Sequence, residues 1–307
     1  MSIPVAAPSR RHRWLTRLGL FIVALLIAVG LLYLVARWHT ARALATVHDI
    51  DDPALVFAGD DAERARGAHL YGVLGCVECH GEDGAGRLVF DAGPVATVVG
   101  PNLTPPSIAG RYDADGLAAA IRHGVRPDGQ PLRFMPAGDF KDLSDADAAA
   151  LVRHLQSLPP SDKAPGEFRI GPLGHVLFLF GKLELVPAAD LDHAPRPRVA
   201  PPEGPTAEYG AYLAQVCTGC HGADLAGQRV PGTPPELPAA ANLTPHADAL
   251  GRWSEADFLR VLREGRRPDG RELHPFMPWR TYGRMTDVEL RAIWAHLRTL
   301  PPVATRT

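Results

Sequence analysis

The sequences Cys76-Val77-Glu78-Cys79-His80 and Cys217-Thr218-Gly219-Cys220-His221 decide how this chain folds, because all four of its cysteines lie in them. Each has the pattern Cys-x-x-Cys-His, which is the attachment site of a c-type haem. Two thiols three positions apart can each bond one haem vinyl group, and the adjacent imidazole then reaches the iron. We therefore predict two covalently attached haem c groups, held by Cys76, Cys79, Cys217 and Cys220, with His80 and His221 as iron ligands.

Other uses of paired cysteines fit the sequence less well. A redox dithiol or half of a zinc site also contains Cys-x-x-Cys, but a zinc site needs four converging ligands. The two pairs are 141 residues apart in the sequence. A disulfide within either pair would close a very small loop and constrain little. Covalent haem is therefore the favoured interpretation.

An N-terminal apolar segment predicts a membrane anchor. Residues 18–36 are uncharged, and as a helix they would be about 28 Å long, which matches the hydrocarbon thickness of a bilayer. A secretory signal peptide is the alternative, since Ala43-Leu44-Ala45 has the form of a cleavage site. The apolar run is longer than a usual signal core, so we favour one uncleaved transmembrane helix within residues 1–45. Four arginines precede the run and two follow it, which predicts a cytoplasmic N-terminus.

The rest of the chain is expected on the periplasmic side of a bacterial inner membrane. Both interpretations of the N-terminus export it, and c-type haem is attached in that compartment. Residues 46–307 contain 26 basic and 34 acidic residues, a net charge of −8. This acidic balance argues against nucleic-acid binding and favours a basic partner surface.

An internal repeat with an offset of 140 to 142 residues organises this exported part. The matched motifs are Asn-Leu-Thr-Pro at 102–105 and 242–245, Gly-Arg-Tyr or Gly-Arg-Trp at 110–112 and 251–253, Arg-Pro-Asp-Gly at 126–129 and 267–270, Phe-Met-Pro at 134–136 and 276–278, and Leu-Pro-Pro at 158–160 and 300–302. One haem motif in each copy predicts two tandem domains. We place them at residues 60–160 and 206–303, joined by a strap and a Pro-rich linker at 161–205.

Each copy is expected to be all-α, with the same order of helices. The first helix should end at the haem motif, the second should cover 114–123 or 255–264, and the last should precede the Leu-Pro-Pro motif. Serine or threonine followed three residues later by an acid has the spacing of a capping box. This spacing occurs at Ser144 and Asp147, Ser254 and Asp257, and Thr286 and Glu289. The Gly- and Pro-rich stretches between helices are expected to wrap the haem.

Met135 and Met277 are the predicted second axial ligands. The chain has four methionines, and these two occupy the same repeat position, between Phe and Pro. Iron bound by His and Met has a raised reduction potential, which suits electron transfer. Met285 is expected to pack as a hydrophobic staple. His123 and His274 are rival ligands, but neither has a histidine counterpart in the other copy.

Two further pairs of residues are expected near the haems. The iron-binding histidines should donate their second ring N–H to a backbone carbonyl, with Pro101 and Ala241 as the acceptors. Arg111 and Arg252 match in the repeat and could bind haem propionates, since a planar guanidinium fits a carboxylate. Equally, they could be solvated residues at helix starts.

Within the linker, residues 171–180 are apolar but too few to span a bilayer. A strap packed between the two haem domains is the favoured interpretation, and a contact with the membrane surface or a partner subunit is the alternative. The prolines that follow predict a stiff, extended spacer up to residue 205.

Together these motifs resemble the bacterial di-haem cytochrome c proteins with two class I type domains. The closest resemblance is to the cytochrome subunits of periplasmic membrane-bound dehydrogenases for alcohols, aldehydes or sugar acids. It covers residues 62–160 and 206–302, and it implies ligation of the two irons by His80 with Met135 and by His221 with Met277. The chain departs from those subunits in having two haem motifs rather than three, and an N-terminal rather than a C-terminal anchor.

The resemblance implies an electron carrier rather than an enzyme. Such a protein would pass single electrons from a dehydrogenase or quinol-oxidising complex to a downstream cytochrome or terminal oxidase of a respiratory chain. The alternative is a di-haem redox enzyme, such as a peroxidase or a sulfur-compound dehydrogenase, with one open haem site. That enzyme would require one iron to lack its methionine ligand.

Overall fold

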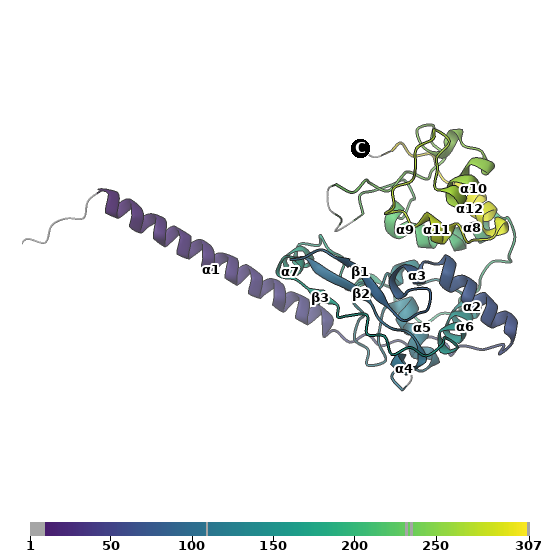
Figure 1. Ribbon diagram of the computed structural model, residues 1–307, viewed down its shortest axis with the longest axis horizontal. Coiled ribbons are helices and arrows are strands. Elements are labelled where there is room, and N and C mark those ends of the chain that lie inside the picture. The colour runs from purple at the N-terminus through teal and green to yellow at the C-terminus, as the bar shows by residue number, and fades with distance from the viewer. Residues whose placement is uncertain (1–9, 109, 231–232, 234–235, 306–307) are drawn as a thin grey trace, which may run out of the picture.

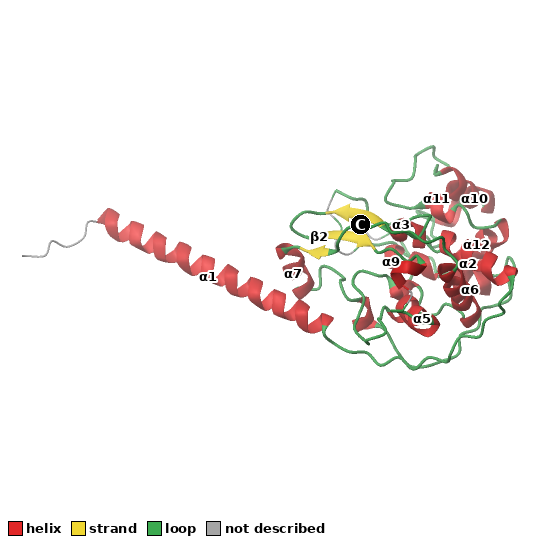
Figure 2. Cartoon of the chain, turned by 60° about the horizontal axis from the view of Figure 1, so that its bottom comes forward, coloured by secondary structure: helices red, strands yellow, loops and turns green. Residues whose placement is uncertain are grey.

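The computed structural model describes residues 10–108, 110–230, 233 and 236–305. It contains one long N-terminal helix, which projects away from a folded body (Figure 1). The body consists of two helical units, the first coloured blue to teal and the second green to yellow in Figure 1. A small sheet belongs to the first unit (Figure 2).

The secondary structure follows the sequence repeat. The α-helices are α1 (Arg10–Leu44), α2 (Asp61–Val73), α3 (Cys76–His80), α4 (Pro105–Ile108), α5 (Ala114–His123), α6 (Asp145–Gln156), α7 (Pro172–Leu179), α8 (Ala207–Leu213), α9 (Gln215–His221), α10 (Glu255–Glu264), α11 (Trp279–Tyr282) and α12 (Asp287–Thr299). The strands are β1 (Arg87–Asp91), β2 (Ala96–Gly100) and β3 (Arg169–Ile170), and the short 3₁₀ turns are η1 (Ala137–Asp139), η2 (Pro187–Asp190) and η3 (Leu250–Arg252).

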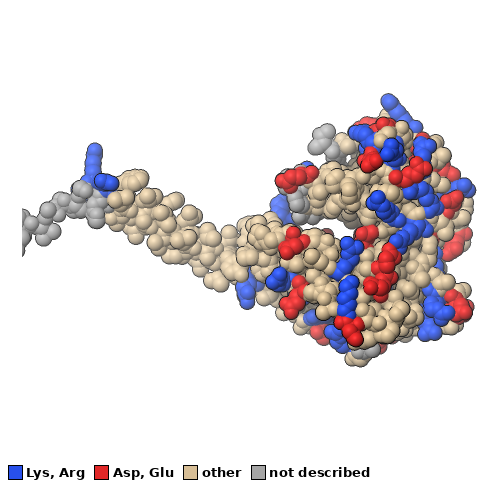
Figure 3. Space-filling model, in the orientation of Figure 1, with Lys and Arg blue, Asp and Glu red and all other residues tan. Residues whose placement is uncertain are grey.

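Helix α1 contains the segment expected to be an anchor. By length and composition, its residues Arg13–Leu44 could cross a bilayer, and its most apolar stretch is not buried by the rest of the protein. A signal sequence would meet the same criteria. In Figure 3 the middle of α1 has an uncharged surface, and basic side chains lie at its N-terminal end.

Each unit is built on a crossing of its first and last helices. Helix α2 packs on α6, and α8 packs on α12. A Cβ atom on Gly67 would lie 1.9 Å from the carbonyl oxygen of Ala150, and one on Gly210 would lie 1.8 Å from that of Ala292. The helices therefore touch at the level of the backbone, and only glycine fits at either crossing.

The predicted second and last helices are confirmed. Helices α5 and α10 have the expected bounds, and each ends at a glycine with left-handed geometry. The capping boxes before α10 and α12 are complete. The one before α6 is only half formed: Ser144 accepts a hydrogen bond from the Asp147 N–H, but the Asp147 carboxylate binds Arg66 and Tyr212 instead.

As expected, the first helix of the first unit ends at the haem motif: α2 ends at Val73, and the left-handed Gly75 (φ 85°) separates it from α3. The units are mostly helical, but the first is not all-α as expected, since it contains the antiparallel sheet β1-β2-β3. Val and Thr residues favour strands, and Gly93 (φ 54°) permits the tight connection between β1 and β2.

The apolar segment of the linker does not pack between the two units as expected. It forms α7, which lies against α1. The ring of Phe178 is 5.2 Å from that of His39, and Nδ1 of His175 is 2.9 Å from Oγ1 of Thr40. Strand β3, just before α7, pairs with β2 of the first unit. The segment therefore connects the first unit to α1.

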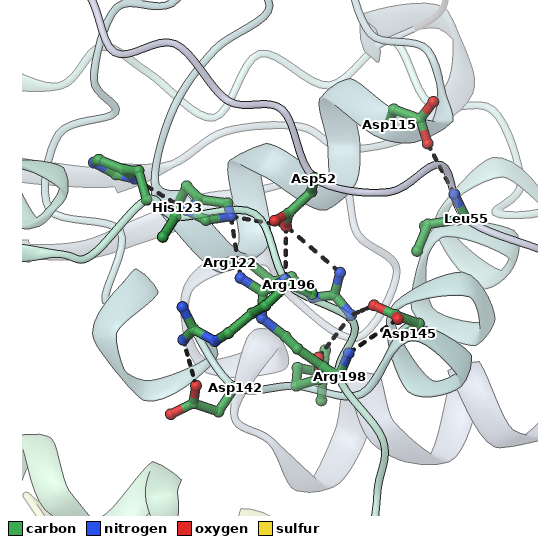
Figure 4. A network of polar contacts seen from close by, with 12 residues as sticks. Asp52, Leu55, Asp115, Arg122, His123, Asp142, Asp145, Arg196 and Arg198 are labelled. Carbon is green, nitrogen blue, oxygen red and sulfur yellow. Dashed lines mark hydrogen bonds and ion pairs between the residues drawn. The ribbon is translucent and has the colours of Figure 1, made fainter.

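A buried polar network fixes both flanking linkers to the first unit (Figure 4). The carboxylate of Asp52, before α2, lies 2.9 Å from Nε2 of His123 and 2.8 Å from Nη1 of Arg198, in the Pro-rich linker. Arg122 donates to Asp145 at 2.7 Å. Although burial opposes it, the hydrogen bond from His123 and the charge of Arg198 lower the pKa of Asp52. His123, a rival iron ligand, thus has another role.

Candidate haem sites

His80 and His221 are buried at the ends of α3 and α9 and make the same hydrogen bond. Their Nδ1 atoms lie 2.9 Å from the carbonyl oxygen of Pro101 and 2.7 Å from that of Ala241. Because a carbonyl only accepts, Nδ1 carries the proton and Nε2 keeps its lone pair for a metal. Burial lowers the pKa of both histidines, which favours the neutral form that binds iron. The two predicted acceptors are confirmed.

The Asn-Leu-Thr-Pro motifs hold these carbonyls in place. Asn102 donates from Nδ2 to the carbonyl of Ser161 at 2.8 Å, and its Oδ1 accepts from the N–H of Thr104 at 2.8 Å. Asn242 makes the equivalent bonds to Val303 and Thr244, at 2.7 and 2.8 Å. Each asparagine therefore ties the loop with the histidine's acceptor to the chain that follows the last helix.

The four cysteines have free thiols, and both thiols of a pair lie on one helix. Positions i and i+3 of a helix share a face, so α3 and α9 each present two sulfurs together. Burial raises the pKa of Cys76 and of Cys217 to about 12, and it also raises the pKa of the other cysteine in each pair. Their surroundings therefore suit an apolar thioether better than a charged thiolate.

A cavity of about 720 Å³ in the second unit brings together four predicted site residues. Cys217, Cys220, His221 and Met277 all line it. This volume lies within the roughly 300 to 1,000 Å³ typical of small-molecule and cofactor sites. Apolar side chains supply much of the remaining wall, including Leu243, Leu250, Trp253, Phe258, Val261 and Leu297. Two thiols, an imidazole, a thioether and an apolar wall fit a covalently attached haem.

The two matched arginines, Arg111 and Arg252, have different surroundings. Arg252 lines the cavity of the second unit. Arg111 is exposed, and its Nε donates to the carbonyl of Ser107, one turn earlier, at 2.8 Å. Sequence reasoning did not single out Arg267 and Arg271, which also line the cavity. The repeated Arg-Pro-Asp-Gly motif contains Arg267 and could have indicated it.

His274 lies at the same cavity as Met277, so its hydrogen bonding decides whether it competes for the iron. The backbone N–H of Phe276 donates to Nδ1 of His274 at 3.1 Å. A neutral imidazole that accepts at Nδ1 carries its proton on Nε2. In this tautomer neither ring nitrogen is free for a metal, which favours Met277.

In the first unit, Met135 packs against the apolar core. Phe134, directly before it, has φ 63°, a left-handed conformation that a bulky residue rarely adopts. The N–H of Phe134 donates to the carbonyl of Leu185 at 2.9 Å, which helps to hold this conformation. Strained backbone of this kind is common next to functional side chains.

Comparison with known families identifies both units. Residues 62–155 match the family model described as cytochrome C oxidase, cbb3-type, subunit III, and residues 207–301 match the model described as cytochrome c. The chain therefore contains two cytochrome c-type domains, one in each unit. Two cytochrome c domains mean two covalently bound haem c groups and a function in electron transfer.

Relatives with similar names support this result. A diheme cytochrome c-type protein of Cereibacter sphaeroides is 29% identical over 282 residues, which are 82% of this chain and 90% of the relative. The cytochrome c subunit of alcohol dehydrogenase (quinone) of Gluconobacter oxydans is 26% identical, over 87% of this chain and 60% of the subunit. The gluconate 2-dehydrogenase cytochrome c subunit of Pantoea cypripedii is 30% identical, over 67% and 52%. The chain thus spans little more than half of these two dehydrogenase subunits.

The two cytochrome c domains contact each other through equivalent positions. Glu78, inside the first haem motif, accepts a hydrogen bond from the Thr281 hydroxyl of the second domain. Gly219, the matching residue of the second motif, donates its N–H to Asp139 of the first domain. Thr281 and Asp139 also match in the repeat. Each haem-binding helix therefore touches the same part of the other domain.

A second pair of contacts also joins the two domains in both directions. Nε2 of His69 lies 2.9 Å from the carboxylate of Glu289, and the hydroxyl of Tyr212 donates to Asp147 at 2.6 Å. His69 and Tyr212 lie on the first helices of their domains, and the two acids begin the last helices. The first helix of each domain therefore contacts the start of the other domain's last helix, a reciprocal arrangement like that of an isologous interface.

Proposed function

We propose that this chain is a membrane-anchored periplasmic carrier of single electrons, with cytochrome c domains at residues 60–160 and 206–303. It would connect a dehydrogenase or quinol-oxidising complex with a downstream cytochrome or terminal oxidase of a respiratory chain. Each bound haem supplies an iron that alternates between the ferric and ferrous states. The chain's own residues hold that iron, exclude water from it and set its potential.

In this proposal each iron is closed to substrates by two protein ligands. Nε2 of His80 and the sulfur of Met135 would hold the iron of the first domain, and His221 and Met277 would hold that of the second. The fixed Nδ1 tautomers of the histidines and the position of Met277 at the cavity support this assignment. A six-coordinate iron has no site for substrate, which suits a carrier rather than an enzyme.

The main support for the proposal is that each haem-binding helix contacts the other domain. Helix α3 touches the second domain at Glu78, and α9 touches the first domain at Gly219. Apolar residues of both domains, among them Leu70, Leu74, Leu213 and Val216, face a common narrow gap between them. An interface of this kind keeps the two attachment sites at a fixed separation, as a relay within one chain requires.

The donor and the location follow from the relatives and from α1. The relatives named as dehydrogenase cytochrome subunits support a dehydrogenase as the electron donor. Helix α1 supports an anchor with its N-terminus in the cytoplasm, because the first four arginines precede the apolar run. The net charge of −8 on residues 46–307 favours a basic surface on the partner.

Carbon monoxide tests the closed coordination. We expect the fully reduced protein to bind none at neutral pH, because a sixth ligand on each iron leaves no position for it. The measurement is the haem absorption spectrum before and after addition of the gas. A Met135→Ala variant should open one haem and serves as the positive control. Rapid binding to one haem of the unmodified protein would instead support the di-haem enzyme.

Asp139 should make the potential of the second haem depend on pH. Burial raises the pKa of Asp139 to about 7, with the charge of Glu184 acting in the same direction and the Gly219 N–H opposing it. The carboxyl group is thus neutral below this pH and anionic above it. An anion beside α9 stabilises ferric over ferrous iron, so the potential should fall by tens of millivolts from about pH 6 to about pH 8.

Spectroelectrochemical titration at several pH values measures this effect. Asp139→Asn should remove most of the slope for one haem. Asp142→Asn should retain it, since the carboxylate of Asp142 pairs with Arg196 at 2.7 Å, whereas that of Asp139 accepts the N–H of Gly219 in α9. Equal slopes in Asp139→Asn and the unmodified protein would assign the pH dependence to another group.

A further inference from the structure

Helix α7 has an apolar surface that no part of the described chain covers. Residues 171–181 contain no charged side chain. Leu173 is 44% exposed and Phe180, directly after the helix, is 62% exposed. Phe180 is more exposed than any other aromatic side chain in the described part of the chain beyond α1. Exposed apolar surface of this kind commonly marks a binding site.

The contacts of α7 with α1 show how deep α7 would lie in a bilayer spanned by α1. Besides Thr40 and His39, the ring of His175 contacts Tyr33, with centroids 6.1 Å apart. Ala36 and Thr40, on the same face of α1, are 0% and 1% exposed. Tyr33 and Ala36 belong to the uncharged run of residues 18–36, and Arg37 directly follows it. Helix α7 therefore lies level with the end of that run.

The polar side chain of α7 points to α1 and is satisfied there. The hydroxyl of Thr40 donates to the carbonyl of Ala36 at 2.9 Å, so Nδ1 of His175 must donate to the oxygen of Thr40. The remaining surface of α7 is apolar. In Figure 3 the uncharged surface of α1 continues onto the adjoining edge of the body.

The position of α7 is fixed from the other side by the first domain. The N–H groups of Gly171 and Leu173 donate to the carbonyls of Val95 and Pro94, in the turn between β1 and β2, at 2.8 and 2.9 Å. A Cβ atom on Gly174 would lie 2.1 Å from the Val95 carbonyl oxygen, so this turn and α7 are in backbone contact. Helix α7 cannot move without the domain.

We propose that α7 and Phe180 lie in the outer interface of the bilayer that α1 spans, and that they hold the first cytochrome c domain against the lipid surface. This rests on the membrane anchoring in the proposed function. An apolar segment beside the end of a span, next to the interfacial aromatic residues Tyr33 and Trp38, suits the boundary between headgroups and hydrocarbon. The domain would then have one fixed orientation instead of moving freely on a stalk.

Cysteine labelling of the full-length holoprotein tests this inference. F180C and L173C are reconstituted in nanodiscs of phosphatidylcholine and phosphatidylglycerol, with one copy per disc, and react with a charged maleimide. V288C is the matched control for L173C, because Val288 is 43% exposed on α12, and V199C provides a fully exposed site at 88%. Each rate, followed by mass, is divided by that of the same variant unfolded in guanidinium.

We expect F180C and L173C to react at least fivefold more slowly than both controls. Smaller protection overturns the proposal. L26C, in the middle of α1, tests the anchor independently. Protection at L26C alone would reject the interfacial position of α7 but leave the anchor intact. Rapid labelling of all sites would reject both the anchor and the position of α7. Rapid labelling of F180C in discs with protection in native membranes would assign the surface to a partner subunit and also overturn the proposal.

Discussion

Replacing Gly67 with alanine should destabilise the first cytochrome c domain by about 3 kcal/mol. The new Cβ would lie 1.9 Å from the carbonyl oxygen of Ala150 and 2.9 Å from Cβ of His154. Neither contact can relax by a side-chain rotation, because one atom is backbone and the other is a Cβ. Helices α2 and α6 would have to separate, which loosens the packing of their buried side chains. Denaturant unfolding followed by circular dichroism measures the loss.

Gly72, on the same helix, provides a matched control. A Cβ there would meet only the side chain of Arg284, at 3.8 Å, and alanine is the better helix former by about 1 kcal/mol. Gly72→Ala should therefore leave the domain as stable or make it more stable. Gly210→Ala should repeat the effect of Gly67→Ala in the second domain. If Gly67→Ala and Gly72→Ala unfold at the same denaturant concentration, the close crossing of α2 and α6 is wrong.

Features set by neighbours in the sequence could be predicted from it. The bounds of α5 and α10 depend on local caps, namely Asp113 or Ser254 at the start and a glycine at the end. The acceptors of the two histidines follow from the repeat position of Pro101 and Ala241. In each case the residues that decide the geometry lie close together in the chain or recur at a fixed offset.

Features that need contacts between distant segments could not be predicted in the same way. Asp147 has the spacing of a capping residue, but its carboxylate binds Tyr212, 65 residues away, because the two domains dock there. The strands β1 and β2 lie in a stretch that its Gly and Pro content marked as a loop, and β3 joins them from the linker. The sequence of α7 favoured a strap between the domains over a contact with the membrane or a partner subunit, and its packing on α1 depends on residues more than 130 positions away.

The haem-binding residues fall between these cases. The cysteines and histidines are defined by one short motif, and the matched methionines by the repeat. The equivalence of Arg111 and Arg252 in sequence did not extend to their positions, since Arg252 lines a cavity and Arg111 binds a carbonyl of its own segment. A matched residue therefore shares a role only where the loop around it also folds alike.

Replacing Met277 with alanine should remove about half of the weak near-infrared charge-transfer absorption of the oxidised protein. That band arises from low-spin ferric haem with a methionine ligand, and in our proposal Met135 and Met277 each supply one such ligand. The potential of the second haem should fall as well, because methionine ligation raises it. The double variant Met135→Ala/Met277→Ala should lose the band completely. Absorption spectra and redox titration of the purified proteins measure both effects.

Met285→Leu is the matched control, because Met285 is 1% exposed within the same apolar core and its counterpart in the first domain is Leu143. This variant should keep the full band. His274→Ala tests whether His274 is the ligand instead. His274 lines the same cavity, but its Nδ1 accepts the N–H of Phe276. A band that survives Met277→Ala unchanged would show that Met277 does not bind the iron. If His274→Ala also altered the coordination of the second haem, His274 would be its ligand in the folded protein.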